Sequence, residues 1–238
     1  MLKFILFAFL IPIQLFAQVD ADSTKKINED KIVKHLVLPG SLVLLGAVIK
    51  ETKYRISFQN WIQSSSLRSN TKVDNYIQYV PVAELYISDL AYSRSKNEIF
   101  QQTKNLAFAE ITTAFIVQIV KRTTNIKRPN GHDFSYFSGH TSQSFTSATA
   151  LFLEYQDINP YVAYSGYLFS TTTGILRVTN NKHWISDVLV GAGIGMISAR
   201  MIWYINPFQN WKPFKKDKVT IIPQINGFEN KLGLTIIF

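Results

Sequence analysis

The chain of 238 residues contains no cysteine. Without a thiol it cannot form a disulfide, use a thiolate as a nucleophile or bind zinc through sulfur. The sequence also lacks internal repeats, low-complexity stretches and a long linker, so nothing divides it into several domains. Once an N-terminal segment is set aside, about 220 residues remain, which is enough for one domain with a substantial core.

Acidic residues are scarce compared with basic ones. The chain has 16 Asp and Glu against 25 Lys and Arg, which gives a net charge of +9 and a pI near 9.6. Such a charge favours anionic partners. Because the chain also carries an export signal, we do not expect nucleic acid as a partner. An anionic membrane surface and a phosphorylated substrate fit the charge better.

Residues 1–17 have the pattern of a secretory signal peptide. One lysine precedes an apolar run, MLKFILFAFLIPIQLFAQ, and we expect cleavage after Ala17. Leu15 is larger than the small residue preferred three positions before the cut, so an uncleaved membrane anchor is the alternative. In both cases the sequence predicts export, with the functional site on the periplasmic side of the cell envelope.

The body of the chain, residues 18–211, is rich in apolar segments long enough for α-helices. They predict an all-α fold, a six-helix bundle, and they cover 36–50, 74–92, 103–122, 142–155, 160–178 and 186–205. Charged residues interrupt three of these segments, and the mean hydropathy of +0.05 is low for a bundle embedded in lipid. We expect a bundle associated with a membrane or partly inserted in it, and a soluble bundle is the alternative.

Residues 212–238 differ from the body. A basic, proline-interrupted stretch leads into VTIIPQI and LGLTIIF, which flank a segment that begins with Asn226-Gly227. Two β-favouring runs around turn-forming residues predict a short C-terminal β-hairpin. We expect this hairpin to pack on the helical body.

The segment 121–129 contains four basic residues and ends in a proline. Lys121 and Arg128 are seven residues apart, almost two helical turns, so on one helix both would point at one target. We expect that helix to end at Pro129, which fixes φ and restricts the residue before it. Arg can bind two phosphate oxygens as a planar fork, and Lys adds a mobile charge. A solvated basic helix end is the alternative for this segment taken alone.

The tripeptide Ser138-Gly139-His140 lies just before an expected helix. The glycine permits backbone amides to turn inward, and amides at a helix N-terminus bind anions without any side-chain charge. His140 would then lie at the mouth of that site. Taken alone, the tripeptide also fits an ordinary surface or packed histidine.

The third block contains Arg177, His183 and Asp187. On a helix, the i, i+4 spacing would place the Asp187 carboxylate beside the His183 imidazole. An Asp held against one ring nitrogen fixes the tautomer and leaves the other nitrogen as a nucleophile. Arg177 lies six residues before His183, so we expect residues 180–182 to form a loop between two helices. A helix-surface pair is the alternative.

Together the three blocks resemble the type 2 phosphatidic acid phosphatase (PAP2) superfamily, which also contains bacterial acid phosphatases and vanadium haloperoxidases. The family pattern is K-x6-R-P, then P-S-G-H, then S-R-x5-H-x3-D, and the similarity covers residues 105–200. Phe137 stands where the family usually has Pro, and Leu176 stands where it usually has Ser. Neither position carries a reacting group, although both neighbour phosphate-binding positions.

The resemblance implies a six-helix phosphatase that needs no metal and no cofactor. His183 would attack phosphorus and form a phosphohistidine with help from Asp187, and His140 would protonate the leaving oxygen. The phosphate-binding residues that it implies are Lys121, Arg128, Ser138, Gly139 and Arg177.

We expect the substrate to be a phosphate monoester or diphosphate that is linked to a lipid. Polyprenyl diphosphate, phosphatidic acid, phosphatidylglycerol phosphate and lipid A phosphates are the candidates, and the sequence does not choose among them. Alternatives are a soluble periplasmic acid phosphatase with broad specificity, a vanadate-dependent haloperoxidase and a non-catalytic envelope protein that keeps an anion site. The small size of the chain argues against a haloperoxidase, and the complete set of reacting residues argues against a non-catalytic protein.

Overall fold

The structure is a computed structural model that describes residues 29–92, 95–207, 209, 220–226 and 231–237. The chain divides into two compact units, Met1–Asn206 and Pro207–Phe238. The predicted signal peptide and the signal cleavage site lie outside the described residues.

The described part of the first unit is entirely helical, as the sequence predicts. Its eight helices are α2 (Glu29–Glu51), α3 (Tyr54–Ser64), α4 (Asp74–Ile77), α5 (Val80–Tyr92), α6 (Ile99–Thr124), α7 (Gly139–Tyr155), α8 (Pro160–Thr179) and α9 (Ile185–Ile205).

The described part of this unit has eight helices where the sequence predicted six. Two local features explain the difference. The expected helix 74–92 is divided into α4 and α5, because Pro81 lacks an amide proton and disfavours helical backbone just before it. In addition, α3 lies in a segment for which the sequence predicted no helix. The other five expected segments lie within helices whose ends coincide with the expected ends or extend up to seven residues beyond them.

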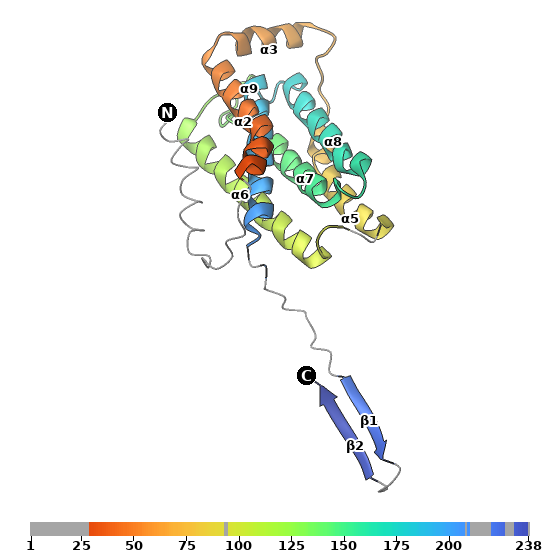
Figure 1. The fold of residues 1–238 in the computed structure, drawn as a ribbon. Coiled ribbons are helices and arrows are strands. Elements are labelled where there is room, and N and C mark those ends of the chain that lie inside the picture. The colour runs from red at the N-terminus through yellow and green to blue at the C-terminus, as the bar shows by residue number, and fades with distance from the viewer. Residues whose placement is uncertain (1–28, 93–94, 208, 210–219, 227–230, 238) are drawn as a thin grey trace. The chain divides into compact units, whose positions relative to one another are not determined.

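Helices α7 and α9 lie in the centre of the bundle, and α3 crosses one end of it (Figure 1). Glycines allow α9 to approach both α7 and α2 closely. A Cβ atom on Gly195 would lie 2.3 Å from the Ser142 carbonyl oxygen of α7, and one on Gly193 would lie 2.5 Å from the Pro39 carbonyl oxygen of α2. Only glycine fits at such backbone contacts.

Buried side chains form a hydrophobic cluster directly behind the end of the bundle where α6 and α8 finish and α7 and α9 begin. This cluster consists of Val117, Val120, Tyr136, Phe137, Val190 and Ile194. A second cluster lies around Leu85, Leu151 and Tyr155. The rigid packing of the first cluster fixes the helix ends on which the predicted site residues stand.

One helix among the described residues, α9, is long and apolar enough to cross a membrane, and 56% of its apolar window is buried within the bundle. Helices α2 and α3 pass the same test only as a pair, with a bend of 88° between them. The core helix of a soluble protein passes the same test.

In the second unit, strands β1 (Thr220–Asn226) and β2 (Lys231–Ile237) pair antiparallel, with Thr220 opposite Ile237 and Asn226 opposite Lys231. The packing of this strand pair on the helical unit remains a prediction.

Candidate active site

The predicted site residues come together at one end of the helical bundle. The C-terminal ends of α6 and α8 bring Lys121 and Arg177, and the segments around the N-termini of α7 and α9 bring His140 and His183. These four side chains line one cavity of about 490 Å³, together with Arg128 and Gly139. The three blocks are therefore joined in space, as the sequence predicts.

His183 and Asp187 form a buried pair. The His183 Nδ1 atom lies 3.3 Å from Asp187 Oδ2, and the two residues are 1% and 0% exposed. His183 does not open a helix as expected. It precedes Trp184, the residue before α9, and Asp187 lies in the first turn of α9, where Oδ2 also accepts the Trp184 amide at 3.2 Å. The Asp187 carboxylate thus caps the N-terminus of α9 and also orients the His183 imidazole.

The hydroxyl of Ser135 supports the same carboxylate, at 2.5 Å from Asp187 Oδ2. With Nδ1 directed at Asp187, the ring presents Nε2 as its other nitrogen. Burial lowers the pKa of His183 to about 4, although Asp187 acts in the opposite direction. The imidazole is therefore neutral near pH 7 and keeps a lone pair for attack.

The expectation that Lys121 and Arg128 share one helix face is wrong. Helix α6 ends at Thr124, because Asn125 adopts a left-handed conformation with φ of 44° and its amide caps the Lys121 carbonyl. Arg128 lies in the loop that follows, where its amide donates to His132 O at 2.7 Å. The loop, rather than the helical period, returns Arg128 to the cavity that Lys121 lines.

The three cations form a positively charged wall. Lys121 donates to the Phe134 carbonyl at 2.6 Å, and its pKa is lowered to about 8 by burial and by the nearby Arg128. The buried Nε atoms of Arg128 and Arg177 have no hydrogen-bond partner within the described protein. Unpaired guanidinium donors that line a cavity fit an oxyanion such as phosphate.

Ser138 starts α7. Its side chain accepts from the Thr141 hydroxyl at 2.9 Å, and its amide donates to the Asp187 carbonyl at 3.1 Å. These bonds tie the start of α7 to the start of α9. Gly139 lines the cavity, whereas Ser138 is fully buried. Phosphate binding by amides near Ser138 and Gly139 stays a prediction, with Gly139 the better placed of the two residues.

His140 lines this cavity and also a second, neighbouring cavity of about 580 Å³. Burial lowers the pKa of His140 to about 4, and the positive charge of Arg177 lowers it further. Arg128, Phe134 and Arg177 line both cavities as well. The two cavities therefore share four lining residues, and the cavity of about 490 Å³ is lined by both histidines and all three cations.

Three residues that contact this machinery were not predicted from the sequence. Asp74 accepts from Arg177 Nη1 at 2.7 Å and from Lys182 Nζ at 2.9 Å, and Asn75 Oδ1 lies 3.1 Å from His140 Nε2. Asp74 and Asn75 belong to α4, far from the three blocks in sequence. No local pattern distinguishes them from other polar residues, whereas Lys182 could have been suspected from its place beside His183.

No three His, Asp or Glu side chains of the described residues are arranged to hold a metal ion. What the described site offers instead is a neutral histidine on a carboxylate, a second histidine and a set of cations. Such a set can bind a phosphoryl group, attack it and protonate the group that leaves.

This combination of an all-helical bundle with an anion site at one end defines a class of phosphoryl-binding protein, and comparisons with known proteins agree. Residues 121–211 match the family model of the PAP2 superfamily. This match covers the end of α6 and all of α7, α8 and α9, so this part of the chain is similar to the PAP2 superfamily.

Two known proteins are similar to the chain. It is 32% identical over 161 residues to the lipid A 1-phosphatase of Porphyromonas gingivalis, a match that covers 64% of this chain and 36% of that protein. The chain thus spans about a third of the length of this curated relative. The crystal structure of Aquifex aeolicus LpxE shares the fold, with a TM-score of 0.50 and 19% identity over 66% of this chain and 98% of that one.

Proposed function

We propose that the protein is a phosphatase that hydrolyses phosphate monoesters or diphosphates through a phosphohistidine, without a metal or another cofactor. The observation that carries the proposal is the buried His183–Asp187 pair, whose histidine lines a cavity walled by Lys121, Arg128 and Arg177. The match of residues 121–211 to the PAP2 family model supports the same chemistry.

In the first step, His183 Nε2 attacks phosphorus, and the bond between phosphorus and the leaving oxygen breaks. His140 gives its proton to that oxygen, so a neutral alcohol leaves from a monoester and a protonated phosphate group leaves from a diphosphate. The Asp187 carboxylate stabilises the positive charge that develops on the His183 ring.

In the second step, water attacks the phosphohistidine. His140, now neutral, takes a proton from the water, the bond between phosphorus and nitrogen breaks, and inorganic phosphate leaves. In both steps Lys121, Arg128 and Arg177 neutralise the charge of the five-coordinate transition state, and the Gly139 amide adds a dipole.

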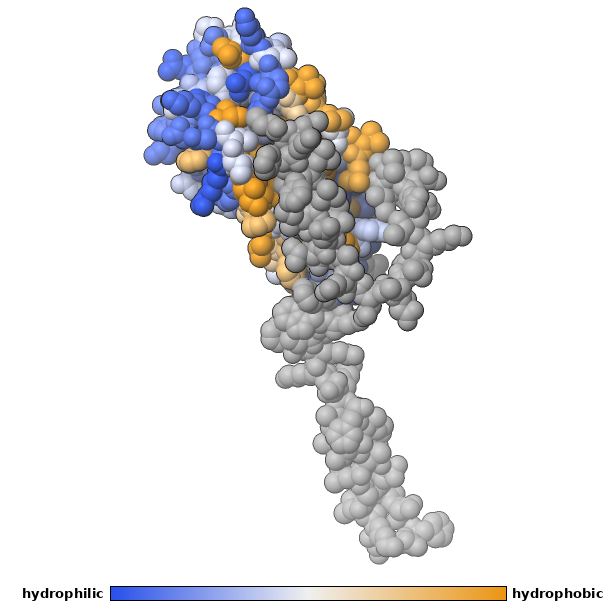
Figure 2. Space-filling model, turned by 90° about the vertical axis from the view of Figure 1, so that its left-hand side faces the viewer, coloured by the Kyte–Doolittle hydropathy of each residue, from blue (hydrophilic) through white to orange (hydrophobic). Residues whose placement is uncertain are grey.

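We propose that the substrate is linked to a lipid. The curated relative is a lipid A 1-phosphatase. The helical unit also exposes apolar side chains on several helices, while hydrophilic residues gather at one end of the face in Figure 2. The exposed apolar residues include Leu44 and Val48 on α2, Ile111 and Phe115 on α6, and Leu168 and Ile175 on α8. Such faces are suited to contact with lipid.

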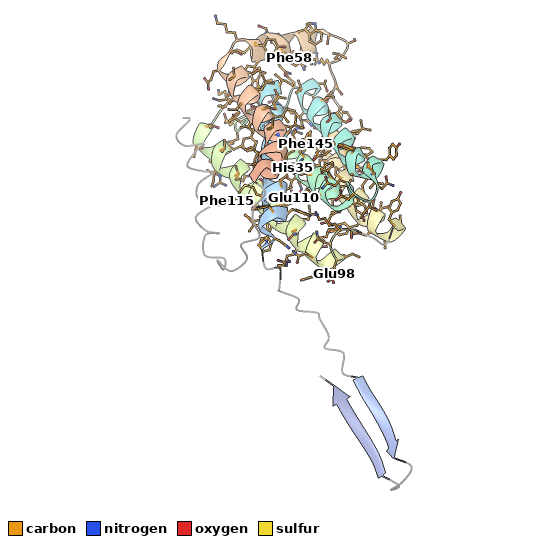
Figure 3. The ribbon with its side chains drawn as sticks, viewed as in Figure 1. His35, Phe58, Glu98, Glu110, Phe115 and Phe145 are labelled. Atoms are coloured by element: carbon orange, nitrogen blue, oxygen red, sulfur yellow. The ribbon has the colours of Figure 1, made fainter. Side chains whose placement is uncertain are left out.

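Helix α6 supports a lipid substrate most directly. Ile111 and Phe115 are 64% and 62% exposed, and Gln118 and Arg122, on the same face, line the cavity that contains His183. Figure 3 marks Phe115 and Glu110 on this helix, and Glu110 instead accepts from Ser147 of α7 at 2.6 Å. From Ala107 to Gln118 the face is about 16 Å long, about half the hydrocarbon thickness of a bilayer.

A lipid chain lying along this face of α6 would bring its phosphate to the cationic wall. Together with the predicted export signal, this arrangement supports action at the periplasmic side of the cell envelope, on or in a membrane. The oligomeric state of the protein has no bearing on this proposal, since one chain supplies every residue of the site.

The test is phosphate release by the purified full chain from a panel of substrates, with EDTA present throughout. The panel contains a lipid A-type 1-phosphate, phosphatidic acid, a polyprenyl diphosphate and a water-soluble phosphate monoester. We expect hydrolysis of at least one lipid substrate, with a kcat/KM at least about tenfold above that for the soluble ester.

Loss of activity in EDTA that a divalent metal restores would refute the proposed chemistry. Hydrolysis of the soluble ester alone would refute the lipid substrate and favour a soluble acid phosphatase. Bromide oxidation with added vanadate, in the absence of phosphate release, would favour a haloperoxidase.

A further inference from the structure

The short helix α4 contacts the machinery of the site although it lies outside the segment that matches the PAP2 family model. Asp74 is fully buried. It accepts hydrogen bonds from Arg177 and Lys182, which precede His183 in the chain. Burial alone would raise the pKa of the Asp74 carboxyl, but the hydrogen bonds from Lys182 and Arg177 outweigh burial and lower it. Asp74 is therefore charged and fully engaged by two cations.

Asn75, the next residue, meets the other side of the site. Its Oδ1 atom lies 3.1 Å from His140 Nε2, and Asn75 and His140 line the same cavity of about 580 Å³. An amide oxygen can only accept a hydrogen bond, so this contact places a proton on Nε2 of His140. One dipeptide thus engages Arg177 with one side chain and His140 with the other.

The backbone around α4 is fastened to the same end of α8. The Ser69 amide donates to Thr179 O at 3.1 Å, and Asn180 makes two hydrogen bonds of 3.0 Å with the backbone of Thr71. Gln59 of α3 also donates to Val178 O at 3.0 Å. These bonds hold α4 in place without touching His140 or Arg177, so the fastening and the site contacts can be tested separately.

We propose that Asp74 and Asn75 are positioning residues of the active site, Asp74 for the phosphate-binding guanidinium of Arg177 and Asn75 for the acid His140. The proposal rests on the phosphatase reaction proposed above. Asp74 holds one side of the guanidinium, so that the unpaired Nε of Arg177 remains for the phosphoryl group. Asn75 holds the ring of His140 in one orientation and in one tautomer.

A simpler explanation is that Asp74 contributes only its charge, through a structural ion pair. This explanation and the positioning role predict opposite changes in vanadate affinity when Asp74 is replaced by Asn. If Asp74 acted only through its charge, Asp74→Asn would leave the site more positive and tighten the binding of vanadate. If Asp74 positions Arg177, the same change misplaces the guanidinium and weakens vanadate binding. Because a loss of orientation outweighs a gain of screened charge at close range, we expect about tenfold weaker binding.

Asn75 is tested by the pH dependence of kcat. The charged and titratable groups that face His140 are Arg177, Asp74, His183 and Lys182, with Lys121, Arg122, Arg128, His132 and Asp133 elsewhere on the two cavity walls. Activity that depends on a protonated acid is lost as pH rises through the pKa of that acid. Asn75→Asp adds a negative charge beside the ring, so the upper pH limit of kcat should move upward by about one pH unit.

Asn75→Ala removes the acceptor and should lower kcat about tenfold, with a smaller change in KM. Asn180→Ala is the matched control, since it removes two hydrogen bonds that fasten α4 but touches neither His140 nor Arg177. We expect Asn180→Ala to lower the melting temperature and to leave the pH profile of kcat in place.

The two parts of the test separate this proposal from the phosphatase reaction. Direct titration of the full chain with vanadate needs no turnover, so tighter or unchanged binding by Asp74→Asn overturns the role of Asp74 even if no substrate is found. An unshifted pH profile in active Asn75→Asp, or the same shift in Asn180→Ala, overturns the role of Asn75. Absence of phosphate release by the unaltered chain counts against the phosphatase reaction instead.

Discussion

In the protein alone, the imidazoles of His140 and His183 both have a pKa of about 4, mainly because both rings are buried. For His183 this is the state that a nucleophile needs at neutral pH. For His140 it is the opposite of what an acid needs. The conflict is resolved if the substrate itself supplies negative charge, because a phosphate dianion would offset the nearby Arg177 and raise the pKa of His140.

Anion binding should therefore be coupled to proton uptake. We expect the full chain to take up a proton on binding sulfate near pH 6, since the pKa of His140 rises from about 4 toward neutrality while sulfate itself does not titrate. Affinity should increase as pH falls from 7 to 5. Calorimetry in two buffers with different ionisation heats measures the uptake. A His140→Gln variant that takes up as many protons as the unaltered chain would contradict the assignment.

The two histidines should also differ in their mutational effects. His183→Ala removes the atom that bonds to phosphorus and should reduce kcat by at least about 10⁴-fold, whereas His140→Ala removes proton transfer and should reduce kcat by about 10² to 10⁴-fold. Vanadate should still bind to the His140→Ala variant, because Lys121, Arg128 and Arg177 are unchanged. Phosphate release is the measurement, and near-normal turnover by His183→Ala would exclude the phosphohistidine.

The sequence predicted contacts between candidate site residues correctly where the partners are close in the chain. His183 and Asp187 are four positions apart, and their contact was predicted correctly. Asp74 and Arg177 are separated by 103 positions, and Asn75 and His140 by 65. Such contacts depend on how α4 packs against the end of α8, which no local spacing encodes. Local patterns therefore predict candidate site residues but miss contacts between residues that are far apart in the chain.

At the scale of secondary-structure elements, the length of the apolar segments predicted the positions of most helices. The errors arose at polar or irregular positions. Asn125 ends α6 three residues before Arg128, so the seven-residue spacing never acts as a helical repeat. Helix α3 was missed because its apolar residues are interspersed with polar ones such as Gln59, which lies against the end of α8. Propensity is a weak guide where tertiary contacts decide the conformation.

The glycines of α9 give an element-scale prediction. Gly195→Ala places a methyl group 2.3 Å from the Ser142 carbonyl oxygen, so α7 and α9 must separate, and we expect a loss of about 1–3 kcal/mol or more. Gly40→Ala, in α2, meets no atom within 4 Å and should stabilise by about 0.5–1 kcal/mol through helix propensity.

Thermal unfolding of the two variants in the same detergent is the measurement. Because both replace a helical glycine by alanine, the difference between them isolates the contact with α7 from the intrinsic preference of the residue. Equal melting temperatures would show that α7 and α9 are not in the close contact described.

At the scale of the whole molecule, two properties favour binding to an anionic membrane. They are the exposed apolar side chains of α2, α6 and α8 and the net charge of +9. The charge would attract the protein to an anionic surface, and the apolar faces would hold it there. The two effects differ in their response to salt, since only the first is screened.

We therefore expect the protein to sediment with membranes, and high salt to release only a minor part of it. Detergent should release the rest. Fractionation of cells followed by salt and detergent washes measures this distribution. Recovery of most of the protein in the soluble periplasmic fraction would contradict membrane association and would weaken the proposal of a lipid substrate.

The close contact between Gly193 of α9 and Pro39 of α2 has a consequence for the order in which the protein folds. The two residues are about 150 positions apart, so the first described helix finds its partner only after the last helix of the bundle is available. Contacts of such sequence separation are made late and slow the reaction. During synthesis, α2 must therefore wait, with its apolar face uncovered, until nearly the entire chain has emerged.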